Sequence, residues 1–287
     1  MGDTTLSEKF NSVVSTEWLA DHLEAPDVRV VDGTYYLPNE NKDARILYQE
    51  AHIRNAIFFD IDDISDTDNP LPHMIPSDIK FASKVRKLGL GDGNRIVVYD
   101  QRGLFSAARV WWMFRLFGHK DVAVLDGGLP KWLSEHRPVD DNTVHPGERH
   151  FTPRFNSFLI RDKEQLLRNI ETGKEQVLDA RASGRFKGEV PEPRAGIRSG
   201  HIPDSYNLPF TNLFKEDGTL KASQDIKSTF EKAGIDYNKP VVTSCGSGVT
   251  AAVLSLGLEL TGHKKTSLYD GSWSEWGQEG DTPVVSG

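Results

Sequence analysis

Residues 241–252 read Val241-Val242-Thr243-Ser244-Cys245-Gly246-Ser247-Gly248-Val249-Thr250-Ala251-Ala252, an apolar run that breaks into a glycine-rich loop and resumes as a helical pattern. The glycines let the backbone turn tightly and direct successive N–H groups into one concavity. The following helix adds the positive end of its dipole, so an anion on the Cys245 sulfur is stabilised there. Because the thiolate is the nucleophilic form of cysteine, this setting predicts a reactive thiol, although residue type alone favours an inert buried cysteine.

The composition of the chain excludes several classes of protein. It has 287 residues, a net charge of −8 and one cysteine. A single cysteine excludes an intrachain disulfide and a cysteine-rich zinc site, and it predicts a reducing, cytoplasmic compartment. We expect no membrane span, because no run of 18 apolar residues occurs, and no nucleic-acid partner, because no basic cluster occurs. Residues 1–11 resemble neither a secretory signal nor a transit peptide.

The sequence contains an internal repeat that covers both halves of the chain. Gly118-His119 matches Gly262-His263, Asp126-Gly127 matches Asp270-Gly271, and Trp132 matches Trp276, each at an offset of 144. Earlier in each half, Ala51-His52-Ile53 matches Gly200-His201-Ile202 at an offset of 149. So long a period indicates tandem domains, because the repeats of solenoid proteins run only about 20 to 50 residues.

Short apolar runs alternate with helical patterns in both halves. We expect strands near 28–31, 57–59, 95–99 and 122–125, then near 176–178, 206–208, 240–244 and 266–269. Helices are expected near 16–23, 79–88 and 107–117, then near 163–170, 224–233 and 249–260. Interleaved strands and helices predict the α/β class, with two domains that each hold a mostly parallel sheet flanked by helices.

The division of the chain follows from its prolines. Residues 135–156 hold Pro138, Pro146 and Pro153 among charged and polar residues, which is typical of a linker. We therefore expect a first domain at 1–136, a linker at 137–156 and a second domain at 157–287. The expected strand 96–99 superposes on 241–244 and places Asp100 opposite Cys245. A carboxylate cannot do the sulfur chemistry of a thiol, so the first domain is expected to be catalytically silent.

The tandem halves and the segment Cys245-Gly246-Ser247-Gly248-Val249-Thr250-Ala251 resemble the two-domain rhodanese superfamily, and within it the 3-mercaptopyruvate sulfurtransferases. The resemblance covers residues 14–276 and implies two tandem rhodanese-like domains. It also implies that Gly246, Gly248, Val249 and Thr250 bind substrate around the catalytic Cys245. Thiosulfate-using relatives typically carry arginine and lysine after the cysteine, so the neutral Gly246-Ser247 pair favours a keto acid.

The resemblance also implies the remaining site residues. Arg185 and Arg194 lie at the family's positions for binding the substrate carboxylate, for which a planar guanidinium is the best match. By residue type alone each would be a solvated surface arginine. Ser247, His73 and Asp62 match a Ser-His-Asp relay, in which the acid orients the imidazole and the imidazole polarises the hydroxyl. Otherwise they would read as a turn serine, a loop histidine and a helix cap.

Together these features predict that Cys245 takes sulfur from 3-mercaptopyruvate, releases pyruvate and holds a persulfide. An acceptor thiol, cyanide or a reduced thioredoxin-like protein would then take the sulfur, because the chain has no second cysteine to resolve the persulfide. No metal and no organic cofactor is implied. The nearest alternative is a thiosulfate sulfurtransferase. A cysteine phosphatase would need an arginine at position 251, which is alanine, and a silent binding module would not need Cys245 in one repeat alone.

Overall fold

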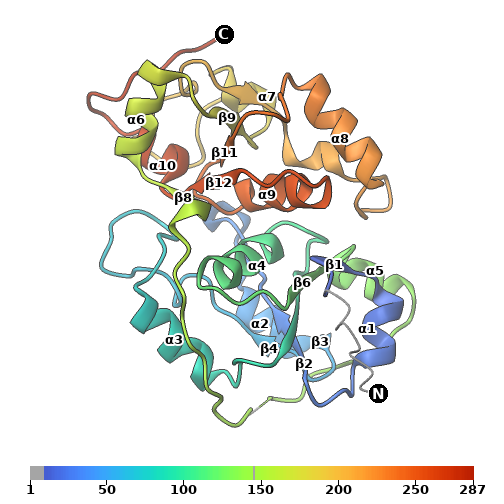
Figure 1. Ribbon diagram of the computed structural model, residues 1–287. Helices are drawn as coiled ribbons and strands as arrows, with labels where there is room; N and C mark the ends of the chain where they lie inside the picture. The colour runs from blue at the N-terminus through green and yellow to red at the C-terminus, as the bar shows by residue number, and fades with distance from the viewer. Residues whose placement is uncertain (1–9, 145) are drawn as a thin grey trace, which may run out of the picture.

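The computed structural model describes residues 10–144 and 146–287 (Figure 1). The expectation about residues 1–11 therefore falls almost wholly outside the described residues. The chain forms two five-stranded sheets, one from each half of the sequence, with helices around them. Among the described residues, no helix is long and apolar enough to cross a membrane.

The first sheet has the strand order β1-β6-β5-β2-β4, and every neighbouring pair in it is parallel. Its central strand β5 pairs on one side with β2, where Val28 lies opposite Arg95, and on the other with β6, where Ile96 lies opposite Val122. The strands are β1 (Val13–Val14), β2 (Val28–Asp32), β4 (Ile57–Phe58), β5 (Arg95–Tyr99) and β6 (Val122–Leu125).

The second sheet repeats this arrangement with the order β10-β9-β11-β12-β8, again parallel throughout. In it β11 takes the place of β5, β9 that of β2 and β12 that of β6. The repeat read from the sequence is thus also a repeat of topology, and the expected fold class is confirmed. The strands are β8 (Ile160–Arg161), β9 (Gln176–Asp179), β10 (Tyr206–Asn207), β11 (Val241–Ser244) and β12 (Thr266–Tyr269).

Ten α-helices occur in the described residues. The longer ones are α3 (Asp78–Lys87), α4 (Ala107–Leu116), α6 (Lys163–Thr172), α8 (Ser223–Lys232) and α9 (Ala251–Leu260). The shorter ones are α1 (Thr16–His22), α2 (Ala44–Glu50), α5 (Gly128–Ser134), α7 (Ser183–Phe186) and α10 (Ser272–Trp276). The periodicity failed to predict α2, α5, α7 and α10, whose four to seven residues give few turns of a helical pattern, although it did predict α1, which is equally short.

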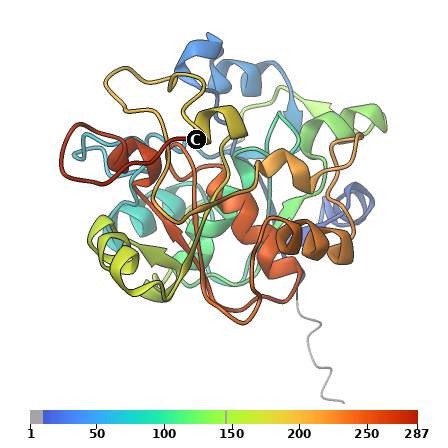
Figure 2. The same ribbon diagram turned by 90° about the horizontal axis from the view of Figure 1, so that it is seen from above.

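Helices α4 and α9 form the boundary between the two halves (Figures 1 and 2). Both are almost entirely buried, because each packs on its own sheet and also on the other helix. A helix that is apolar all round is expected in such a position. One continuous apolar core therefore runs across the boundary, from Val31 and Val98 in the first half to Val241 and Leu268 in the second.

The segment expected to be a linker is packed against the first half over much of its length. Within it, β7 (Val139–Asp140) pairs antiparallel with β3 (His52–Ile53). Phe151 is fully buried beside Phe81 and Phe114. The prolines correctly indicated irregular backbone here, but such backbone can still bury an aromatic side chain. The exact domain limits 1–136, 137–156 and 157–287 stay a prediction.

Candidate active site

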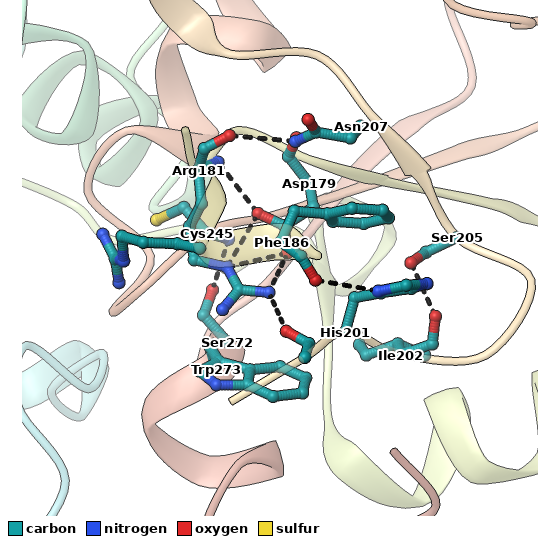
Figure 3. Close-up of polar contacts among 12 residues, drawn as sticks. Asp179, Arg181, Phe186, His201, Ile202, Ser205, Asn207, Cys245, Ser272 and Trp273 are labelled. Carbon is teal, nitrogen blue, oxygen red and sulfur yellow. Dashed lines mark hydrogen bonds and ion pairs between the residues drawn. The ribbon is translucent and has the colours of Figure 1, made fainter. Parts of the chain in front are cut away.

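Cys245 lies at the carboxyl end of β11, and its side chain is buried. Its N–H donates to the Ser272 hydroxyl at 3.2 Å, and its carbonyl accepts from the Trp273 N–H at 2.9 Å. Figure 3 shows these residues with Asp179 and Arg181, which come from the end of the neighbouring strand β9. The backbone of the cysteine is thus held by the first two residues of α10 (Ser272–Trp276).

The loop after Cys245 carries unpaired hydrogen-bond donors. Within the described part of the chain, none of the six backbone N–H groups of residues 246–251 makes a hydrogen bond. Helix α9 begins at Ala251 and not at residue 249 as expected, because Gly248 adopts a φ of 76°. Buried N–H groups are rarely left unpaired, so these donors form a site for an anion at the cysteine sulfur.

The first half contains the same loop with its anion already in place. Asp100 follows β5 as Cys245 follows β11, and its Oδ2 atom accepts from the N–H groups of Phe105, Ser106 and Ala107 at 2.7 to 2.8 Å. Its Oδ1 atom accepts from the Arg102 N–H at 2.9 Å. In the first half the loop N–H groups are thus satisfied by a carboxylate side chain, and in the second half Cys245 stands at the matching position.

A cavity of about 160 Å³ opens beside Cys245. This is smaller than the roughly 300 to 1,000 Å³ of sites for drug-sized ligands, so it suits a small substrate. The first half contributes Tyr35, Leu37 and Phe105 to its wall, and the second half contributes Arg181, Arg185, Arg194, Phe210, Gly246, Ser247, Val249 and Thr250. Both halves of the chain therefore contribute to the wall of this cavity.

Glu192 organises two of the three arginines at this cavity. Its side chain is buried and pairs with Arg181 at 2.8 Å and bidentately with Nε and Nη2 of Arg185. Arg181 is further held by Asp179, and although burial lowers its pKa, the charges of Asp179 and Glu192 raise it overall. Arg181 is therefore structural, whereas Nη1 of Arg185 has no hydrogen-bond partner among the described residues and can bind a ligand. Gly246 permits this approach, because a Cβ there would lie 3.2 Å from Arg185 Nη2.

Arg194 is a cation without an acidic partner among the described residues, and it lines the same cavity. It lies beside the Tyr35 hydroxyl, with which it interacts. Burial raises the pKa of Tyr35 to about 12, even though Arg194 acts to lower it. The phenol therefore stays protonated near neutral pH and can donate a hydrogen bond. Arg185 and Arg194 together present two positive groups to a small anion.

The residues of the expected relay are brought together in part. Asp62 Oδ1 lies 2.9 Å from His73 Nδ1, although the two groups lack the alignment of a full hydrogen bond. His73 is buried, packs edge-on against Tyr35 with ring centroids 4.6 Å apart, and leaves Nε2 unpaired in the described structure. Ser247 lines the cavity, but no hydrogen bond joins it to His73 in the described residues. Gly248 is absent from the cavity wall, since its carbonyl faces Arg109 at 3.4 Å.

Sequence reasoning missed Tyr35, Phe105, Arg181 and Glu192 at the cavity. Glu192 could have been found from the sequence, because it is an acidic residue only two positions before Arg194, which was expected to bind substrate. Tyr35 and Phe105 belong to the other half of the chain. No local pattern marks them, because their place at the cavity depends on how the halves meet.

A buried cysteine followed by a loop of unpaired N–H groups in the described structure, at the end of a parallel strand in one of two tandem α/β units, defines a class of thiol-dependent enzymes. The family model described as "Rhodanese-like domain" matches residues 15–135 and 162–279. The chain belongs to the rhodanese family, as its loop and repeat indicated.

Individual relatives agree with this assignment. A 3-mercaptopyruvate sulfurtransferase from Mus musculus is 43% identical, over 93% of this chain and 92% of its own length. A thiosulfate sulfurtransferase from Rattus norvegicus is 41% identical, over 93% of this chain and 92% of its own. The crystal structure of SseA from Escherichia coli, described among 3-mercaptopyruvate sulfotransferases, has a TM-score of 0.84, 38% identity and coverage of 92% of this chain and 99% of that one.

Proposed function

We propose that this chain is a 3-mercaptopyruvate sulfurtransferase that works through a persulfide on Cys245. One observation carries the proposal: in the part of the chain that the structure describes, the six N–H groups of residues 246–251, directly after the cysteine, have no hydrogen-bond partner, whereas Asp100 fills the matching site of the other half. A persulfide is an anion at the position that Asp100 occupies in the first half. Preorganised backbone dipoles stabilise such a charge without rearrangement.

The reaction balances in two steps. The Cys245 thiolate attacks the donor sulfur, a new S–S bond forms, and the C–S bond breaks with its electron pair on carbon, which gives the enolate of pyruvate. The proton on the donor sulfur passes to that enolate through Ser247 and His73, with Asp62 orienting the imidazole. An acceptor thiolate or cyanide then attacks the outer sulfur and restores the Cys245 thiolate.

The residues after the cysteine support mercaptopyruvate over thiosulfate. Sequence identity alone does not separate the two donors, because relatives named for each are 43% and 41% identical. Gly246 and Ser247 add no charge at the sulfur, while Arg185 and Arg194 lie where a carboxylate would bind. The decisive experiment compares kcat/KM for the two donors with cyanide as acceptor. A large preference for mercaptopyruvate is expected, and a preference for thiosulfate would overturn the substrate while leaving the persulfide in place.

We expect removal of Arg185 or Arg194 to raise KM for mercaptopyruvate. Each charged hydrogen-bonding group is worth about 1.5 to 3 kcal/mol, or roughly 10- to 150-fold in kcat/KM. Lysine should restore only part of this loss, because it keeps the charge but loses the planar fork. Arg198 serves as the control, since it binds the Trp276 carbonyl and Thr282 away from the cavity. Steady-state kinetics equal to wild type for Arg185→Ala and Arg194→Ala would contradict the assignment.

The proposal identifies the sulfur acceptor by its chemical class. The cavity admits cyanide or a small thiol directly, and a reduced thioredoxin-like protein would have to present its thiol at the cavity mouth. We further propose a reducing compartment, the cytoplasm, because a single catalytic thiol needs reducing surroundings to stay active. Cell fractionation with an antibody to the chain tests this.

A further inference from the structure

A buried ion pair crosses the boundary between the two halves at the back of the candidate active site. Arg109 of α4 has no exposed surface, and its Nη2 lies 2.7 Å from Oδ1 of Asp270, which follows β12 and is also buried. The guanidinium stacks over the Trp112 ring at 4.6 Å. Burying two charges is costly unless their other hydrogen bonds are also made, so the remaining partners of this pair indicate its purpose.

Those partners include the segment that carries His73. Arg109 Nη2 donates to the His73 carbonyl at 2.5 Å, and Asp270 Oδ2 accepts from the Ile75 N–H at 2.8 Å. His73 has a φ of 61°, in the left-handed region that a residue with a side chain rarely adopts. Such a conformation persists only where the surroundings impose it. The ion pair forms hydrogen bonds to the backbone on both sides of residue 74 and thereby imposes the left-handed conformation of His73.

The same pair also contacts the cysteine loop. Arg109 Nη1 approaches the Gly248 carbonyl at 3.4 Å, one residue after Ser247. Two residues after Asp270, the Ser272 hydroxyl receives the Cys245 N–H. One guanidinium–carboxylate unit thus touches the segment of His73 from the first half and the loop of Ser247 and Cys245 from the second.

We infer that Arg109 and Asp270 are positioning residues, which set His73 against the cysteine loop and so join the two halves of the relay. The inference rests on the proposed function, since it gives the pair its purpose in that reaction. Neither side chain lines the substrate cavity, so neither binds the donor. The expected effect is on proton delivery, and therefore on kcat, with KM for mercaptopyruvate unchanged.

The test uses Arg109→Lys, which keeps the charge but cannot reach three acceptors, and Asp270→Asn, which keeps the shape but loses the charge. Each should lower kcat about 10- to 100-fold, the cost of a small misplacement of a reacting group, with KM within about twofold of wild type. The double variant should lose little more than either single one, because the two residues act as a unit. His73→Ala in the Arg109→Lys background should likewise add little.

The matched control is Arg115→Lys. Arg115 lies on the same helix and also bridges the two halves, pairing with Glu259 of α9 at 3.2 Å, but it lies away from Cys245. The Arg115→Lys variant should keep wild-type kcat even if its melting temperature falls. Equal losses in Arg115→Lys and Arg109→Lys, or losses that follow melting temperature alone, would reduce the pair to a general interface contact and overturn the inference.

A second readout does not depend on activity. The His73 ring signals in the histidine NMR spectrum, assigned with His73→Gln, should move in Arg109→Lys and Asp270→Asn and stay in place in Arg115→Lys. Unmoved His73 signals would refute positioning whatever the kinetics. Full activity in His73→Ala would instead refute the relay, which is part of the proposed function. The NMR result would still show whether Arg109 and Asp270 position His73.

Discussion

Cys245→Ser is expected to abolish sulfur transfer while leaving the fold intact. Serine is nearly isosteric at this buried position, but its alkoxide is inaccessible near neutral pH. Removing the nucleophile from an active site of this kind costs at least about 10⁴-fold in kcat. Release of pyruvate from mercaptopyruvate is the measurement, and turnover within tenfold of wild type would refute the nucleophile.

Mass spectrometry checks the intermediate directly. Wild-type protein treated with mercaptopyruvate in the absence of acceptor should gain one sulfur, about 32 Da, and lose it when cyanide is added. Because the chain has one cysteine, any persulfide must lie on Cys245. An unmodified Cys245 peptide from an actively turning-over sample would exclude the persulfide route.

Gly248→Ala should lower kcat/KM by about 100-fold or more. Gly248 has a φ of 76°, and a Cβ there would lie 2.9 Å from Arg109 Nη1 and 3.0 Å from the Asp270 carbonyl. Relief of this contact requires the loop to move, and with it the N–H groups that we propose stabilise the persulfide. A displacement of about 1 Å in an active site has an effect of this size.

Gly262→Ala is the control for backbone strain alone. Gly262 has a similar φ of 82°, but no atom lies within 4 Å of the position of its Cβ, and it follows the far end of α9. It should lose about 1 kcal/mol of stability with normal kinetics. If both alanine variants show the same kinetic constants, the exact shape of the cysteine loop does not matter for catalysis, and the role given to its N–H groups is wrong.

The sequence predicted those features of the molecule that are encoded locally or repeated. Strands 95–99, 122–125 and 266–269 were located to the residue, the first two because buried parallel strands are short, largely apolar runs and the third because it repeats the strand at 122–125. Cys245 was singled out by its own loop, and the superposition of strands 96–99 and 241–244 placed Asp100 opposite it, as the matching pairings of β5 and β11 confirm. Arg185 and Arg194 came from the resemblance, and the cavity does bring them together.

Tertiary structure alone decided what lies around that cysteine. Tyr35 and Phe105 come to its cavity from the other half because α4 and α9 pack against each other, and a contact between helices about 140 residues apart leaves no local pattern in the sequence. The same packing decided that Arg109 meets Asp270. The sequence also could not show whether the loop N–H groups have hydrogen-bond partners, because this depends on which side chain folds back onto them. Asp100 accepts these hydrogen bonds in the first half, and no side chain does so in the described part of the second half.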